Sequence, residues 1–118
     1  MATLQALVAG AEDALERDPA VARMLAIIRA PNALGDFGRY RGVIEIGLGL
    51  ESFIAAARSQ PTLGTRGTPT WSPTITLTTY VDEALPDEEL QDVLRELMAA
   101  HPWETPVIEV RASRLLTR

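Results

Sequence analysis

The stretch PTITLTTYVDEALPDEELQDVLRELMAA, residues 73–100, decides the fold class because its hydrophobic period changes from two residues to 3.6. Residues 73–81 alternate an apolar set with a threonine-rich set, which predicts a half-buried strand of an antiparallel sheet. Three acidic residues follow Pro86, as a helix N-terminus favours, and apolar residues then recur at helical spacing. We therefore expect a helix over residues 87–100, which Pro102 ends.

A second apolar alternation follows this helix. Pro106 begins it, and Val107, Ile108 and Val110 alternate with charge up to Arg111. This pattern predicts a last strand. The order strand, helix, strand then implies a right-handed crossover and a parallel pair of strands.

The segment before residue 73 supplies the partner strand. Residues 43–50 predict a strand, in which alternate apolar side chains from Ile44 to Leu50 share one face. Residues 53–58 are expected to be a helical turn or irregular, and residues 60–72 a loop that is long for a small domain. Together these elements predict an α+β fold, a ferredoxin-like sandwich with an antiparallel-containing sheet and helices on one face.

Residues 1–30 are predicted to be helical, which is atypical in front of such a sheet. Thr3 is a candidate N-cap, and Asp18-Pro19 is typical of a cap followed by proline at the first helical position. This favours two short helices or one helix bent at Pro19, with a strand over residues 3–9 as the alternative. We expect one domain over residues 1–118, in which residues 31–118 form the sheet core with a C-terminal β-α-β unit.

Composition narrows the function classes. The chain has 118 residues, no cysteine and a single histidine, which excludes a disulfide framework, a thiol nucleophile and a zinc ribbon. All eleven basic residues are arginines, and sixteen acids give a net charge of −5, so we expect no nucleic-acid partner. No apolar run approaches a membrane span and no signal peptide is evident, so we expect a cytoplasmic protein without a membrane partner.

Three segments carry a family resemblance. The run from His101 to Pro106, HPWETP, resembles the His-Pro-Tyr-Glu-x-Pro signature shared by the CutA proteins and the YqfO-like insert domains. Residues 33–37 and 61–67 are similar to two YqfO-like glycine segments, and CutA lacks the glycine loop. Over roughly residues 19–112 the chain therefore resembles a stand-alone YqfO-like domain. Such domains occur as inserts in the dinuclear-metal NGG-interacting-factor proteins and are distant relatives of CutA and PII-type proteins.

The resemblance implies an oligomeric small-molecule-binding or regulatory module with no evident catalytic apparatus. It favours self-association as a trimer, with a dimer next. The family begins with a strand for which this chain has no clear counterpart, and a missing strand would leave a sheet edge open to a partner subunit. The metal ligands of the full-length dinuclear proteins lie outside the insert, so their chemistry is not carried over.

The glycine segment 35–42 supplies candidate ligand-binding residues, namely Asp36, Arg39 and Tyr40. Arg39 offers a forked donor for the carboxylate or phosphate of a small anionic molecule, and Tyr40 offers a planar face and a hydroxyl. The alternative is that the glycines only serve tight turns. A small enzyme that acts by orienting its substrate in a pocket between subunits is a second function hypothesis, although no catalytic residue is identified.

His101 and Glu104 are the other candidate ligand-binding residues, and they are also candidate ligands for a divalent metal, the one possible cofactor. The alternative is that His101 caps the C-terminus of the helix over residues 87–100. We expect the ligand site where the segments 35–42, 61–67 and 101–106 meet.

Overall fold

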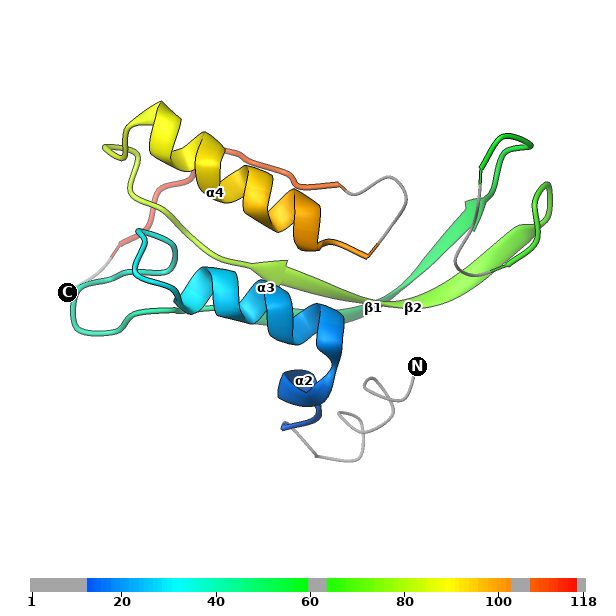
Figure 1. Cartoon of the computed structure of the whole chain (residues 1–118), viewed down its shortest axis with the longest axis horizontal. Helices are drawn as coiled ribbons and strands as arrows, with labels where there is room; N and C mark the ends of the chain where they lie inside the picture. Colours follow the sequence, from blue (N-terminus) through cyan, green and yellow to red (C-terminus); the bar gives the residue numbers. More distant parts are fainter. Residues whose placement is uncertain (1–12, 60–63, 103–106, 117–118) are drawn as a thin grey trace.

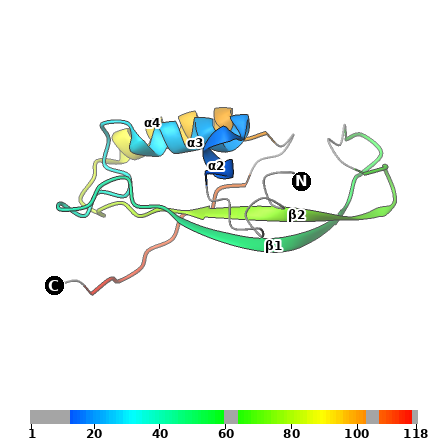
Figure 2. The same ribbon diagram turned by 90° about the horizontal axis from the view of Figure 1, so that it is seen from below.

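The computed structural model describes residues 13–59, 64–102 and 107–116. In these ranges the chain is α+β, with helices on one face of a two-stranded antiparallel sheet (Figures 1 and 2). The elements in chain order are α2 (Ala14–Arg17), α3 (Pro19–Arg29), β1 (Glu45–Ile54), β2 (Pro69–Thr78) and α4 (Asp87–Ala100). None of the described helices has the length and apolar character that crossing a membrane requires.

Two helices separated at Asp18 confirm the predicted restart. The Asp18 carboxylate accepts hydrogen bonds from the backbone N–H groups of Ala20 and Val21, at 3.0 and 3.2 Å, and Pro19 occupies the first helical position. This side-chain cap satisfies N–H groups that have no partner within the helix. The predicted Thr3 cap and the alternative strand over residues 3–9 lie outside the described residues.

The α4 helix confirms the predicted range of residues 87–100. Its first turn carries three acidic residues, which complement the positive end of the helix dipole. At the other end, the backbone N–H of His101 donates to the carbonyl oxygens of Leu97 and Met98, at 3.1 and 3.3 Å. His101 therefore occupies the C-cap position, and the contact comes from its backbone N–H, which any residue other than proline would supply.

The two strands are shifted relative to the prediction. β1 runs to Ile54 rather than ending at residue 50, and β2 begins at Pro69, inside the predicted loop 60–72. The ladder ends before residue 79 because Gly35 lies between the strands. The Gly35 N–H donates to the Tyr80 carbonyl at 2.7 Å, and the Val43 N–H donates to the Gly35 carbonyl at 3.0 Å.

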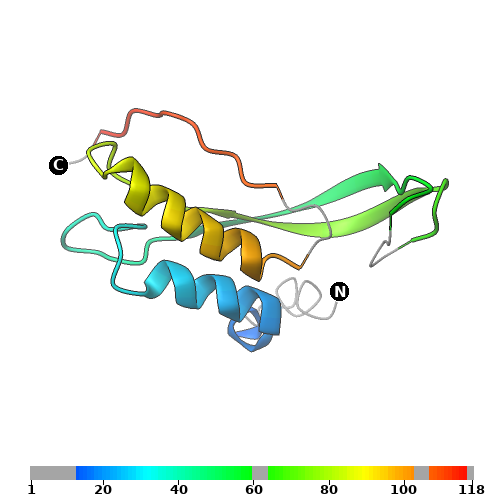
Figure 3. The ribbon, with the colours of Figure 1, turned by 45° about the horizontal axis from the view of Figure 1, so that its top comes forward.

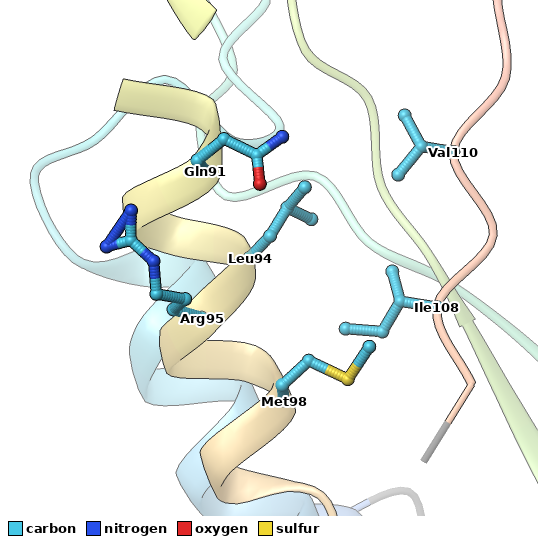
Figure 4. A pocket seen from close by; sticks show the side chains of 6 residues that line it. All are labelled: Gln91, Leu94, Arg95, Met98, Ile108 and Val110. Atoms are coloured by element: carbon cyan, nitrogen blue, oxygen red, sulfur yellow. The ribbon is translucent and has the colours of Figure 1, made fainter. Parts of the chain in front are cut away.

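The predicted last strand and its parallel pairing are wrong for the described residues 107–116, which form no ladder with the sheet. This segment runs beside α4 (Figure 4), and Ile108 packs against the core. Val107 and Val110 stay 70% and 58% exposed. The alternation therefore marks one partly buried position, Ile108, which packs against the core without backbone pairing to the sheet.

The buried core is small and lies where α3 and α4 cover the base of the hairpin. Among the described residues, its central cluster is formed by Ile28, Leu34, Val93 and Leu97, with Ile44 packed against it. Beyond this base, the hairpin extends past the helices (Figure 1). We call residues 48–54 of β1 and their partners 69–75 of β2 the projecting half of the hairpin.

Candidate functional site

The glycine loop 35–42 is held by hydrogen bonds within itself. The Asp36 carboxylate accepts from the Gly38 N–H at 2.9 Å, and the Phe37 N–H donates to the Tyr40 carbonyl at 2.9 Å. Gly35 has a φ of +65°, a conformation that glycine adopts with little strain. The tight-turn alternative therefore accounts for Gly35 and for the contact that Asp36 makes.

Arg39 and Tyr40 are both exposed, and Tyr40 retains 76% of its accessible surface. A ligand held by these two side chains would rest on an open surface rather than inside a pocket. Beside the loop, Asp36, Arg29 and Arg41 line a recess of about 20 Å³. That volume holds about one water molecule, so an organic ligand does not fit in it.

His101 is half-buried at the end of α4, and burial lowers the pKa of its imidazole below the ordinary 6.5. The neutral form of the ring is therefore favoured at neutral pH. Glu104 lies outside the described residues, so a metal site of His101 with Glu104 stays a prediction. Within the described ranges, no group of three or more His, Asp or Glu side chains is placed to hold a metal ion.

The predicted meeting of the two glycine loops does not occur. Gly35 lies at one end of the ladder, bonded to Tyr80, whereas the Gly67 N–H donates to the Ala55 carbonyl at the other end. Ten residue pairs separate the two ends, about 30 Å at the usual rise of a strand. In Figures 1 and 3 the glycine loop 35–42 lies at the end of the molecule where α4 begins. His101 is the C-cap residue at the other end of that helix.

A groove that the sequence did not indicate lies between α4 and the C-terminal segment. Figure 4 shows Leu94 and Met98, one helical turn apart, facing Ile108 across a cavity of about 180 Å³. The lining residues are Gln91, Leu94, Arg95, Met98, Ile108 and Val110. This volume is below the usual range for a drug-sized ligand, about 300–1,000 Å³. A single apolar side chain or a small fragment fits it better.

Of the described residues that line this groove, Arg95 alone is charged. Its Nη1 atom lies 2.9 Å from an oxygen of Asp92, so its charge is already paired on the helix surface. The sequence signals for the groove are the spacing of Leu94 and Met98 and the alternation of Ile108 with Val110. These two patterns predict a helix and a strand, and neither shows by itself that a gap remains between the two segments.

The projecting half of the hairpin has two different faces. Leu48 pairs with Ile75 and Leu50 with Pro73 on the apolar face, whereas Gly49 pairs with Thr74 on the reverse face. Leu50 is 71% exposed on the apolar face. The predicted apolar face of this strand is thus real, but the described helices α2, α3 and α4 leave half of it exposed.

Comparison of the chain with known protein families, with curated proteins and with solved structures found no match. Function therefore has to be inferred from the three features described above. These are an exposed loop with Arg39 and Tyr40, a small apolar groove on α4, and an uncovered apolar face on the hairpin.

Proposed function

We propose that this protein is an oligomeric module that binds a small anionic molecule or regulates a partner, of the YqfO-like type that its sequence resembles. The observation that carries the proposal is the exposed apolar surface of the projecting half of the hairpin. Leu50, Ile54 and Trp71 are 71%, 63% and 69% exposed there. Burying a large apolar side chain contributes about 1.5–3 kcal/mol, so a partner that covers this face gains a substantial driving force.

The total surface supports the same proposal. The chain exposes 9066 Å², whereas a compact monomer of this mass exposes about 6,300 Å². A standard protein interface buries about 800 Å² on each partner. The excess is larger than one such interface, and the radius of gyration of 16.1 Å exceeds the roughly 13.5 Å expected for 118 residues.

The ligand proposal rests on the glycine loop. Arg39 presents a planar fork that matches a carboxylate or a phosphate, and Tyr40 presents an exposed ring beside it in sequence. Because the loop is open to solvent, we expect it to bind a single anion weakly. The groove on α4 is mainly apolar and suits an anion less well.

The mass of the protein in solution tests the oligomeric part of the proposal. Light scattering on a sizing column at tens of micromolar should give a multiple of the 12.8 kDa chain mass. A mass of one chain across that concentration range would contradict the proposal, because the exposed apolar face would then remain in water.

Titration with inorganic phosphate, followed by chemical-shift changes of the amides, tests the ligand part. We expect shifts in residues 35–42, and a several-fold weaker response in an Arg39→Gln variant. Arg58→Gln is the matched control, because Arg58 is equally an exposed arginine in a loop but lies at the other end of the ladder. Equal responses of the two variants would show that the glycine loop is not the anion site.

A further inference from the structure

The two outer edges of the sheet differ in whether they can accept another strand. In β2, Pro73 lies opposite Leu50 and Pro69 lies opposite Ile54. A proline has no N–H, so in a regular antiparallel ladder it occupies a pair whose backbone groups point away from the partner strand. The outer edge of β2 therefore lacks two donors, and proline is a residue with which proteins block strand edges.

The alternation of inward- and outward-pointing backbone groups also determines which β1 residues line its outer edge. The backbone N–H and C=O groups of Leu50 point away from β2, and so do those of every second residue along β1, namely the even-numbered residues from 46 to 54. None of these residues is a proline. Five N–H donors and five carbonyl acceptors thus line this edge. Within the described ranges no third strand pairs with the sheet.

The β1 edge also lacks the usual protection against pairing. Its sequence EIGLGLESFI contains no lysine, arginine or proline, and its only charges are Glu45 and Glu51. The side chains of the outward-pointing residues lie on the apolar face, where Leu48 and Leu50 are 50% and 71% exposed. In the described part of the chain an unpaired edge thus adjoins an exposed apolar face, so a partner strand at this edge also brings its own apolar side chains beside Leu48 and Leu50.

We infer that β1 pairs antiparallel with β1 of a second copy of this chain, which gives a four-stranded sheet in the order β2, β1, β1 of the second copy, β2 of the second copy. Antiparallel pairing of an edge with itself is a two-fold operation, so this contact closes at two copies. The inference rests on the proposed function only in taking the chain to be oligomeric. It adds the surface, the symmetry and the partner.

Charge limits the register of this pairing. Centred on Leu48, the two strands place Glu45 opposite Glu51, and centred on Glu51 they place Glu51 opposite itself. Like charges directly opposite each other destabilise a sheet. Centred on Leu50, Glu51 lies opposite Gly49, and no two acids are opposed.

Of the two registers that pair most of β1 without opposing two acids, packing selects the one centred on Leu50 over the one centred on Gly49. With Leu50 opposite Leu50 of the second copy, Ile46 lies opposite Ile54 on the apolar face. On the reverse face Phe53 lies opposite Gly47, so an aromatic ring covers a glycine that leaves the sheet bare. Centred on Gly49, Ile46 faces Ser52 and two glycines oppose each other.

Disulfide trapping tests the inference, because the chain has no cysteine of its own. Opposite residues of an antiparallel pair have Cα atoms about 4.5–5.5 Å apart, which a disulfide spans. Under mild oxidation Leu50→Cys should form a covalent dimer. Trp71→Cys is the matched control, since Trp71 is equally exposed on the same face but its two copies would lie at least three strand spacings apart, about 14 Å.

A mixing experiment tests the register independently of any one variant. Ile46→Cys and Ile54→Cys should each stay uncrosslinked alone and form a covalent heterodimer when the two proteins are mixed. Circular dichroism of the reduced variants confirms that they are folded. Two results would overturn the β1 contact but leave the proposal of an oligomeric module intact. The first is an oligomeric wild type in which Trp71→Cys cross-links and Leu50→Cys does not. The second is a wild-type mass of three chains. A mass of one chain would contradict both.

Discussion

The two halves of the hairpin come from the same pair of strands and share one alternation, but they differ in what covers them. At the base, Ile44 packs against a core in which Ile28 is 3% exposed. In the projecting half, Leu50 on the same face is 71% exposed. The difference arises because the hairpin is longer than the helices that pack on it. The ladder of ten pairs spans about 30 Å, whereas the 11 residues of α3 and the 14 of α4 span about 17 and 21 Å.

Alternation therefore identifies which residues share a face, but the reach of the packed helices decides which of them are buried. At the base, Gly35 also joins the two strands through backbone hydrogen bonds to Val43 and Tyr80. We accordingly expect stability to reside at the base and association to reside in the projecting half. Variants in the two halves should therefore differ in whether they change stability or association.

Replacing a buried side chain at the base should give the largest change in stability. Ile28→Ala removes a side chain that is 3% exposed and leaves a cavity, so we expect the free energy of unfolding to fall by about 2–5 kcal/mol. Chemical denaturation measures this. Leu50→Ala, in the projecting half, should change the unfolding of the single chain by less than about 0.5 kcal/mol and weaken association instead. Equal losses of stability in the two variants would contradict the division.

Adding a methyl group to a glycine should have opposite consequences in the two halves. A Cβ at Gly35 would lie 2.6 Å from the backbone N and O of Val43, and the φ of +65° disfavours alanine. We expect Gly35→Ala to lower the free energy of unfolding by about 1–3 kcal/mol or more. At Gly49 the nearest atom is a Thr74 methyl at 3.7 Å, so Gly49→Ala should be neutral or slightly stabilising, by up to about 0.5–1 kcal/mol. Thermal unfolding of both variants checks the contrast, and a stable Gly35→Ala would show that the base tolerates strand separation.

The elements that were predicted correctly are those whose signals are contiguous in sequence. The cap at Asp18, the proline after it and the acidic first turn of α4 lie within the helices that they define. The strand ends at the base were wrong because they depend on a distant residue. Gly35 takes the hydrogen bonds that would have extended the ladder to Tyr80, and no local pattern near Tyr80 indicates this.

The candidate site was predicted less well because it required loops to meet across the fold. The turn around Asp36 and the cap at His101 follow from local chemistry and are both present. The distance between the two glycine loops depends on the length of the ladder, which extended to Ile54 rather than residue 50. The groove beside Leu94 arises where the segment after α4 runs beside the helix without joining the sheet, which alternation alone does not indicate.

A smaller effect is expected at the N-terminus of α3, which belongs to the helical layer over the base. Asp18→Ala removes the carboxylate that accepts from Ala20 and Val21, and should lower the free energy of unfolding by about 0.5–2 kcal/mol. Asp13→Ala is the matched control. Among the described residues, the Asp13 side chain makes no cap and pairs with Arg17 in an exposed ion pair, a type that contributes about 0.3–0.5 kcal/mol. If urea denaturation gave the same loss of unfolding free energy for Asp18→Ala and Asp13→Ala, the Asp18 cap would not stabilise the helical layer.

The smallest expected effect is a pH dependence of the base that the projecting half does not share. Burial lowers the pKa of His101 in the folded protein below 6.5, so the unfolded chain binds this proton more readily. The sign follows from linkage: the contribution to stability is fully present above pH 6.5 and is lost as pH falls through 6.5 toward the lower folded pKa. The free energy of unfolding measured at pH 7.5 and 5.5 should therefore fall more in the wild type than in His101→Gln, which retains every acidic residue. Leu50→Ala should keep the wild-type pH dependence, because Leu50 lies on the hairpin beyond the helical layer. If stability fell equally in the wild type and in His101→Gln, the pH dependence would come from the carboxylates, and His101 would not contribute to it.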